Sequence, residues 1–296
     1  MGYTLIANTL PRSASNDEFR AWGSMISNMF ANSGLVAQTG IGEINWTTVA
    51  MPGAAYAVQG YEVWRFADAL QSTYPVYFRV DYGSGQTNNR PAMWFTIGSG
   101  IQSNGNLTGV RSPITYTGNG HSLLAGANSS ANTLLTYYCG DTSRFVIAWC
   151  AAGTGANSML HMFASMERTV DANGSPTGDG VLLAFSDYNV RKQVAWQRTI
   201  GDYTAVEESW GILMPNTTSG VSGSNTAVYP LFHAAGPYLN PGLNLLSYFQ
   251  GDFTANTSNA LTFYGTSHTY MPLGNAAIHT TSRRAGAAST LMIRWE

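Results

Sequence analysis

The chain has 296 residues, of which only 10% are charged, and its formal net charge is -2. It contains one lysine, Lys192, whereas an ordinary soluble domain carries about 25% charged residues. The sequence has no basic stripe of the kind that would indicate a nucleic-acid partner. Its apolar content of 44% argues against disorder. Surface charge keeps monomers soluble and apart. The low charge content of this chain therefore favours a component of an assembly over a free enzyme.

The first residues of the chain lack the basic and apolar regions of a signal peptide. No apolar run approaches the roughly 20 residues needed to span a bilayer. We therefore expect no membrane partner.

The first predicted element is a helix that Ser15 or Asn16 can cap and that Gly34 can end. Its apolar residues recur at spacings of three and four and form one stripe. The stripe comprises Phe19, Trp22, Ile26, Met29 and Phe30. It can pack on the body of its own subunit, or serve as an assembly helix that docks on a neighbouring subunit.

Beyond residue 35 the alternation of apolar and polar residues predicts β-strands. In segment 75–82 one face carries Val76, Phe78 and Val80, and the other carries Tyr77, Arg79 and Asp81. Other strands are expected at 61–66, 93–97, 133–139, 144–150, 159–168, 181–187, 192–199 and 210–214, with a helical turn at 68–72 and turns at 98–100, 104–105 and 119–120. Their spacing suits a sandwich or a barrel.

The amino-acid composition changes near residue 215, where a tract rich in Ser, Thr, Gly and Asn (215–225) indicates a linker or a long loop. Later strands are expected at 228–233, 244–250, 260–264, 268–273 and 289–295, with a proline-flanked segment at 237–242. We divide the chain into an N-terminal arm and helix (1–35), a main β body (36–214) and a C-terminal β region (215–296). The last two parts can pack as one unit.

The two cysteines, Cys139 and Cys150, fall on the two strands of one predicted hairpin. In that register Cys150 lies opposite a residue near Leu134, so the cysteines are about five residues, or roughly 16 Å, apart along the strands. A disulfide needs Cα atoms within about 7 Å. We therefore expect two free, buried thiols, as in a reducing cytoplasm.

Metal-binding patterns are weak in this sequence. The five histidines are far apart and form no ligand cluster, which argues against zinc. One oxygen-rich loop could offer calcium ligands through Asp171, Asn173, Ser175 and Asp179. This loop lacks the final bidentate glutamate of an EF-hand and lies between two predicted strands, so a tight turn explains the same residues.

Catalytic motifs are absent: the sequence has no Gly-x-Ser-x-Gly elbow and no phosphate-binding loop that ends in Gly-Lys-Ser/Thr. We therefore predict no catalytic residue, no cofactor and no enzymatic activity. A polysaccharide-degrading enzyme is one alternative, with Glu207 and Glu208, or Asp179 and Asp187, as acid pairs. It predicts a groove that holds two carboxylates about 5–10 Å apart.

The 36 aromatic residues raise a second alternative, a receptor- or glycan-binding module at a fibre tip. Flat rings can stack on sugars, and this alternative predicts exposed Trp or Tyr side chains clustered on loops. Six tryptophans lie in strand-like runs, which favours core or interface packing instead. They are Trp46, Trp64, Trp94, Trp149, Trp196 and Trp210.

Several stretches resemble a family of structural proteins from tailed bacteriophages. These stretches are 60–66 with 75–85, 140–146, 167–174 with 178–180, 239–246, 268–274 and 291–296. The resemblance covers most of the chain and implies a virion component of the tail, neck, baseplate or fibre region, present in several symmetric copies. It implies assembly in the host cytoplasm, with copies of itself and other virion proteins as partners and a host surface glycan as a further candidate. It carries no catalytic or ligand residue onto this chain.

We therefore predict a mainly β fold with an antiparallel sandwich or jelly-roll-like body and one N-terminal α-helix. The predicted function is structural: a self-associating virion part that acts by burying apolar and aromatic surface.

Overall fold

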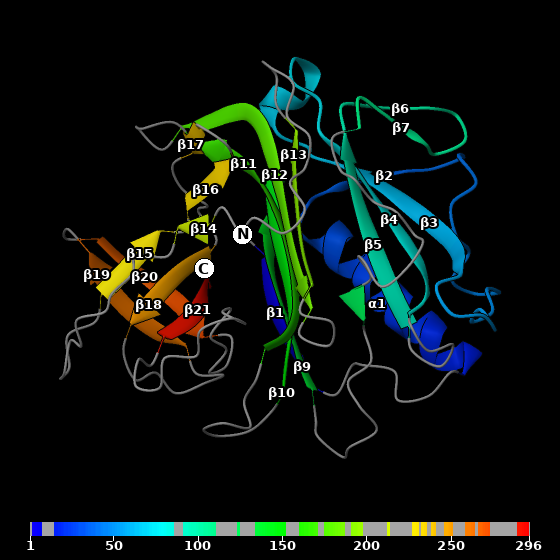
Figure 1. Cartoon of the computed structure of the whole chain (residues 1–296), viewed down its shortest axis with the longest axis horizontal. Coiled ribbons are helices and arrows are strands. Elements are labelled where there is room, and N and C mark those ends of the chain that lie inside the picture. Colours follow the sequence, from blue (N-terminus) through cyan, green and yellow to red (C-terminus); the bar gives the residue numbers. More distant parts are fainter. Residues whose placement is uncertain are drawn as a thin grey trace.

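The computed structural model describes most of the first half of the chain and a series of strands in the second half. The described residues are 2–7, 15–85, 91–110, 123–124, 134–151, 160–170, 175–186, 191–197, 212–213, 227–230, 232–235, 238–240, 246–250, 258–263, 266–272 and 289–295. The fold is mainly β with one N-terminal helix, as predicted, and its strands form several antiparallel sheets (Figure 1).

Helix α1 (Asn16–Asn32) confirms the predicted helix. Its N-cap is Ser15, whose side-chain oxygen accepts a hydrogen bond from the backbone N–H of Glu18 at 3.2 Å. This bond satisfies one of the backbone donors that a helix start leaves without a partner. After the last turn Gly34 has a φ of +90°, the left-handed conformation that glycine adopts without strain.

The largest sheet has six strands in the order β1-β9-β10-β11-β12-β13. Its strands are β1 (Gly2–Ala7), β9 (Leu134–Asp141), β10 (Arg144–Ala151), β11 (Leu160–Val170), β12 (Pro176–Ser186) and β13 (Arg191–Gln197). The strands expected near β9 to β13 are confirmed. Strand β1 was not predicted, and it joins the N-terminal segment to this sheet by placing Gly2 opposite Gly140.

A second sheet has five strands in the order β2-β3-β4-β5-β8. Its strands are β2 (Val36–Gln38), β3 (Val58–Arg65), β4 (Tyr77–Ser84), β5 (Pro91–Gly98) and β8 (Leu123–Leu124). Turn η1 (Ala69–Ser72) confirms the predicted helical turn, and a small hairpin of β6 (Gly100–Ile101) and β7 (Leu107–Thr108) follows β5. The shortest strands, β2, β6, β7 and β8, were not predicted because two or three residues give no periodicity.

Two further sheets lie in the C-terminal part of the chain. One has the order β15-β18-β21-β20-β19, with β15 (Ala227–Pro230), β18 (Leu246–Gln250), β19 (Asn259–Phe263), β20 (Thr266–Pro272) and β21 (Ser289–Arg294). The other has the order β14-β16-β17, with β14 (Ile212–Leu213), β16 (Phe232–Ala235) and β17 (Tyr238–Asn240). Strand β14 lies before residue 215 and its partner β16 lies after it, so this small sheet spans the predicted boundary between the main β body (36–214) and the C-terminal β region (215–296). The predicted turn at 119–120 and the tract at 215–225 lie outside the described residues.

The apolar stripe of α1 packs inside its own chain. Its five predicted residues are at most 2% exposed and share one core with residues of the six-stranded sheet and of the second sheet. The ring centroid of Phe30 lies 4.9 Å from that of Phe145 in β10 and 5.4 Å from that of Phe78 in β4. The structure therefore shows packing on the same subunit, and the stripe is not available as an assembly helix for a neighbour.

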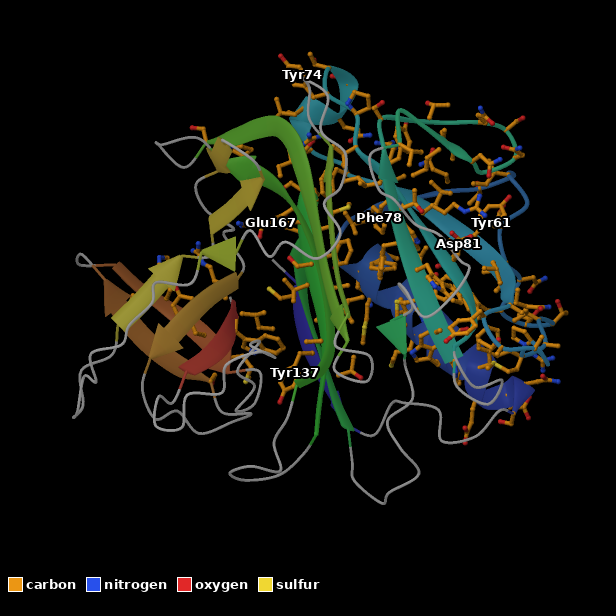
Figure 2. All side chains as sticks on the ribbon, in the orientation of Figure 1. Tyr61, Tyr74, Phe78, Asp81, Tyr137 and Glu167 are labelled. Carbon is orange, nitrogen blue, oxygen red and sulfur yellow. The ribbon has the colours of Figure 1, made fainter. Side chains whose placement is uncertain are left out.

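The second sheet has an inner face, toward this core, and an outer face. The predicted alternation in β4 is confirmed, because Val76, Phe78 and Val80 are fully buried on the inner side. Figure 2 shows Phe78 directed toward the middle of the molecule, whereas Tyr61 and Asp81 lie on the outer side. Asp81 is nevertheless only 1% exposed, so the outer face is itself partly covered.

The six-stranded sheet also packs on the side opposite the helix. There the ring centroids of Tyr137 in β9 and Trp295 lie 5.9 Å apart. The thiol of Cys139 donates a hydrogen bond to the carbonyl of Arg294 at 3.0 Å. The residues that end β21 and follow it therefore tie the C-terminal five-stranded sheet to the six-stranded sheet.

The cysteine hairpin has nearly the predicted register, with Cys150 opposite Leu135 and Cys139 opposite Val146. The four-residue offset corresponds to roughly 13 Å along β9, too far for a disulfide. Cys139 is a free thiol, and burial raises its pKa to about 12. The side chain of Cys150 lies outside the described residues, so its free thiol stays a prediction.

Candidate functional site

The weak calcium candidate falls on the connection between β11 and β12. These strands pair up to Val170 and Pro176, which agrees with a turn between two strands. Asp171 and Asn173 lie outside the described residues, as does the side chain of Asp179, while Ser175 is exposed. Within the described part of the chain no three His, Cys, Asp or Glu residues gather into a potential metal site.

The charged residues of the second sheet and its loops form hydrogen bonds with other groups of the same chain. The carboxylate of Glu43 accepts backbone N–H groups of Gly40 at 3.1 Å and of Ile41 at 3.0 Å. Backbone hydrogen bonds, first its own and then that of Gly40, lower the pKa of Glu43. The guanidinium of Arg65 donates to the carbonyl of Phe66 at 3.1 Å.

A second internal contact surrounds Glu62, a buried carboxylate on the inner face of β3. Its Oε1 accepts the indole N–H of Trp46 at 3.0 Å, and its Oε2 accepts the hydroxyl of Tyr82 at 2.8 Å. The indole N–H of Trp64 also points to Oε2, at 3.4 Å. Three aromatic donors therefore satisfy this carboxylate, as a buried charged group requires.

Stability in alkali should depend on Tyr82. Burial, and then the charge of Glu62, raise the pKa of Tyr82 well above its ordinary value of 10.0. In the unfolded chain this phenol ionises near pH 10 while the folded chain keeps it neutral, so the stability present below pH 10 falls as the pH rises further. Tyr82→Phe should remove up to about 1.4 kcal/mol per pH unit from the slope of unfolding free energy above pH 10.

Urea unfolding at pH 9 to 11 would measure this slope. Tyr74→Phe is the matched control, because the side chain of Tyr74 is 40% exposed and meets water in both states. Equal slopes for Tyr82→Phe and the unmodified chain would contradict the expectation.

On the outer face, Arg79 joins the sheet to the β6–β7 hairpin. Its guanidinium lies over the ring of Tyr61, 3.8 Å from the centroid, and forms an ion pair with Asp81 at 2.7 Å. It also donates to the carbonyl of Gly105 at 3.1 Å and to the side chain of Asn106 at 2.9 Å. These contacts engage both the carboxylate of Asp81 and the guanidinium of Arg79, so the cluster holds the hairpin against the sheet instead of offering open ligands.

Asp68 is the remaining acidic residue of described residues 36–85 and 91–110, and it pairs with Arg168 of β11. The guanidinium donates to both carboxylate oxygens, with a distance of 3.0 Å from Nη2 to Oδ1. Arg168 also donates to the carbonyl of Gly178 at 3.2 Å and lies over the ring of Phe66. This pair connects η1 with the six-stranded sheet.

As a result, the charged residues of this part of the chain are buried or half-buried. Among described residues 36–85 and 91–110, none of the exposed residues is Asp, Glu, Lys or Arg. A soluble surface typically contains about 25–35% of these residues. We call these exposed residues the charge-free surface: Ala37, Thr39, Gly40, Gly42, Asn45, Thr47, Thr48, Ala50, Gly53, Ala54, Ala55, Val58, Gln59, Ala67, Ala69, Ser72, Thr73, Tyr74, Gln102, Ser103, Asn104, Asn106, Thr108, Gly109 and Val110.

The charge-free surface consists of small, amide and hydroxyl side chains with a few larger apolar ones. The exposed large apolar residues of the described chain are Val58, Tyr74 and Val110, at 38%, 40% and 42%. All three belong to this surface. The sequence showed how little charge the chain has, but not that Arg79 and Asp68 are covered by contacts with residues distant in sequence.

The features expected for the two alternative functions do not come together in the described part. Trp64 and Trp94 are buried and Trp46 is half-buried, which agrees with core packing. The side chains of Trp149 and Trp196, and all of Trp210, lie outside the described residues.

The enzyme alternative requires two carboxylates that face one groove. The buried carboxylates Glu62 and Asp81 lie on opposite faces of one sheet. Asp187, Glu207 and Glu208 are outside the described residues, as is the side chain of Asp179.

No helix within the described ranges is long and apolar enough to cross a membrane. Comparisons with protein-family models, with curated proteins and with solved structures gave no match.

Proposed function

We propose that this chain is a structural subunit of a tailed-phage particle, in its tail, neck, baseplate or fibre region. The subunit associates with copies of itself and with other virion proteins in the host cytoplasm, and it uses no cofactor, nucleic acid or membrane. Its action is burial of surface, not bond chemistry. The phage assignment rests on the sequence stretches that resemble such proteins, and the assembly role rests on the charge-free surface.

The charge-free surface supports this role for a physical reason. Charged residues are costly to bury at an interface unless they are paired, and interface cores are depleted of them. A surface of small, amide and apolar groups can be covered with little desolvation penalty.

We also propose that the six-stranded sheet and the second sheet are the two halves of the expected antiparallel sandwich or jelly-roll-like body. The contact between Phe78 of β4 and Phe145 of β10, with ring centroids 5.1 Å apart, supports this arrangement, as does the core that the sheets share. An experimental structure with the two sheets face to face at about 10 Å would agree with a sandwich. Sheets that meet only at their edges would contradict it.

Two measurements test the function. Light scattering of the purified chain at micromolar concentration should give one discrete multimer, and a clean monomer would contradict self-association. Mass spectrometry of purified particles should detect the chain in a fixed ratio to the other virion proteins. Particles that lack it would contradict the virion assignment even if the chain is multimeric.

A further inference from the structure

The loop that joins β6 to β7 carries an Asn-Gly pair, Asn104–Gly105. In such a pair the backbone nitrogen of the glycine can attack the side-chain amide carbon (Cγ) of the asparagine, because glycine has no side chain to hinder the approach. A succinimide ring forms as the bond between Cγ and the amide NH2 breaks, and ammonia leaves with the proton of the glycine N–H. Water then opens the ring and leaves an aspartate or an isoaspartate.

The two residues of this pair differ in their access to water. Asn104 is exposed, whereas Gly105 is buried. A Cβ at Gly105 would lie 2.2 Å from Cε2 of Tyr61, so the ring of Tyr61 covers this glycine. The hairpin therefore presents the amide of Asn104 to water but shields the nitrogen that must attack it.

Two hydrogen bonds within the hairpin restrain the reacting groups. The backbone N–H of Gly105 donates to the carbonyl of Gln102 at 3.0 Å, so the proton that must be removed is already engaged. The side-chain oxygen of Asn104 accepts the backbone N–H of Asn106 at 3.1 Å. The first bond must be lost before the ring can close, and the second restrains the rotation that brings Cγ toward the glycine nitrogen.

The outer face of the second sheet holds the same pair by its two carbonyl groups. The hydroxyl of Tyr61, which Figure 2 shows on this outer side, donates to the carbonyl of Asn104 at 2.8 Å. The guanidinium of Arg79 donates to the carbonyl of Gly105 at 3.1 Å. Side chains of β3 and β4 therefore keep the hairpin closed around the Asn-Gly pair.

We propose that Asn104 is a deamidation site that the closed β6–β7 hairpin protects, and that it reacts only after the hairpin opens. Local opening costs less free energy than global unfolding, so the folded chain can still reach the reactive state. The product is a carboxylate on the charge-free surface, and thus the first exposed charge among described residues 36–85 and 91–110. An isoaspartate would also lengthen the backbone by one carbon at the point where Tyr61 and Arg79 hold it.

The deamidation rate of the folded chain, compared with that of the chain unfolded in urea, tests this protection. Both samples would be kept at the same mildly alkaline pH and temperature, and mass spectrometry would follow the peptide that contains Asn104. Loss of two ordinary hydrogen bonds corresponds to an equilibrium factor of roughly thirty, so the folded chain should deamidate at Asn104 at least about thirtyfold more slowly. Equal rates in the two samples would overturn the proposal.

The sequence supplies an internal reference for the unfolded rate. Asn119–Gly120 and Asn173–Gly174 are the same dipeptide, so in urea all three pairs should react at similar rates. Slow reaction of Asn104 in urea as well would mean that its neighbours in sequence, and not the hairpin, slow it, which also overturns the proposal.

Tyr61→Phe tests whether the contacts of the hairpin provide the protection. This variant keeps the ring over Gly105 but removes the hydroxyl that binds the carbonyl of Asn104. It should speed deamidation of the folded chain about fivefold and leave the rate in urea unchanged. Tyr74→Phe is the matched control, because Tyr74 lies between η1 and β4 and is 40% exposed, and it should change neither rate.

Measurement in both conditions separates an opened hairpin from a lost fold. Circular dichroism should show Tyr61→Phe to be folded, and a rate that rises only in the folded sample supports the proposal. An unchanged folded rate would overturn the assignment of the protection to the hairpin contacts. If Tyr61→Phe unfolds, its rates with and without urea become equal, and the comparison of the unmodified chain alone decides the proposal.

Discussion

Replacing Asp68 with asparagine should lower the free energy of unfolding by about 3 kcal/mol. The reason is that Arg168 would keep its charge inside the protein without a counter-charge. The Arg168 side chain is 2% exposed and that of Asp68 is 14% exposed, so little water can take over the role of the carboxylate. The remaining contacts of the Arg168 guanidinium, to Gly178, to the side chain of Gln71 and over Phe66, do not neutralise it.

Urea or thermal unfolding would measure this loss. Asp17→Asn is the matched control, because Asp17 pairs with Arg20 at 3.2 Å while 94% of its own side chain is exposed. Exposed pairs contribute about 0–1 kcal/mol, so the control should change stability little. Adding Arg168→Met to Asp68→Asn should recover part of the loss by removing the buried charge. A loss below about 1 kcal/mol for Asp68→Asn would mean that the pair is more hydrated than its burial indicates.

Phe30→Ala should be comparably severe, with a loss of about 3–5 kcal/mol. The Phe30 side chain is 1% exposed and fills the space where α1 meets both large sheets. Besides Phe78 and Phe145, it contacts Trp64 of β3 with ring centroids 5.4 Å apart. Truncation removes apolar burial and leaves a cavity that three separate elements cannot close together.

Thermal unfolding of Phe30→Ala, Phe30→Leu and Asn28→Ala would separate cavity formation from helix propensity. Phe30→Leu keeps much of the volume and should lose clearly less than Phe30→Ala. Asn28→Ala changes an exposed position two residues earlier on the same helix and should cost almost nothing. A small effect of Phe30→Ala would indicate that the sheets can close around the gap.

Local signals explain what the sequence could predict of this fold. The cap at Ser15, the stripe of α1 and the alternation along β4 all lie within one element, so each was visible in a short window. Strand β1 was not, because its partner β9 lies more than a hundred residues later and the segment 2–7 carries no clear alternation.

The candidate surface depended on contacts that no local pattern encodes. The sequence placed Arg79 and Asp81 on one face of a strand, but it could not show that the hairpin at 100–108 closes over them. The partner of Arg168 is one hundred residues away in the chain. Scarcity of charge was therefore predictable from composition, whereas the contacts that cover Arg79 and pair Asp68 with Arg168 required the tertiary structure.

The order of strands in the C-terminal five-stranded sheet has a consequence for biosynthesis. Strands β18 and β20 do not pair with each other, since β21 lies between them and follows both in the chain. A ribosome must therefore translate β21 before this sheet can close, and until then both strands expose edges that can recruit other chains. Nascent subunits held close together on one message would be most at risk, so we expect yield to improve when ribosomes are spaced further apart on the message or chaperones are abundant.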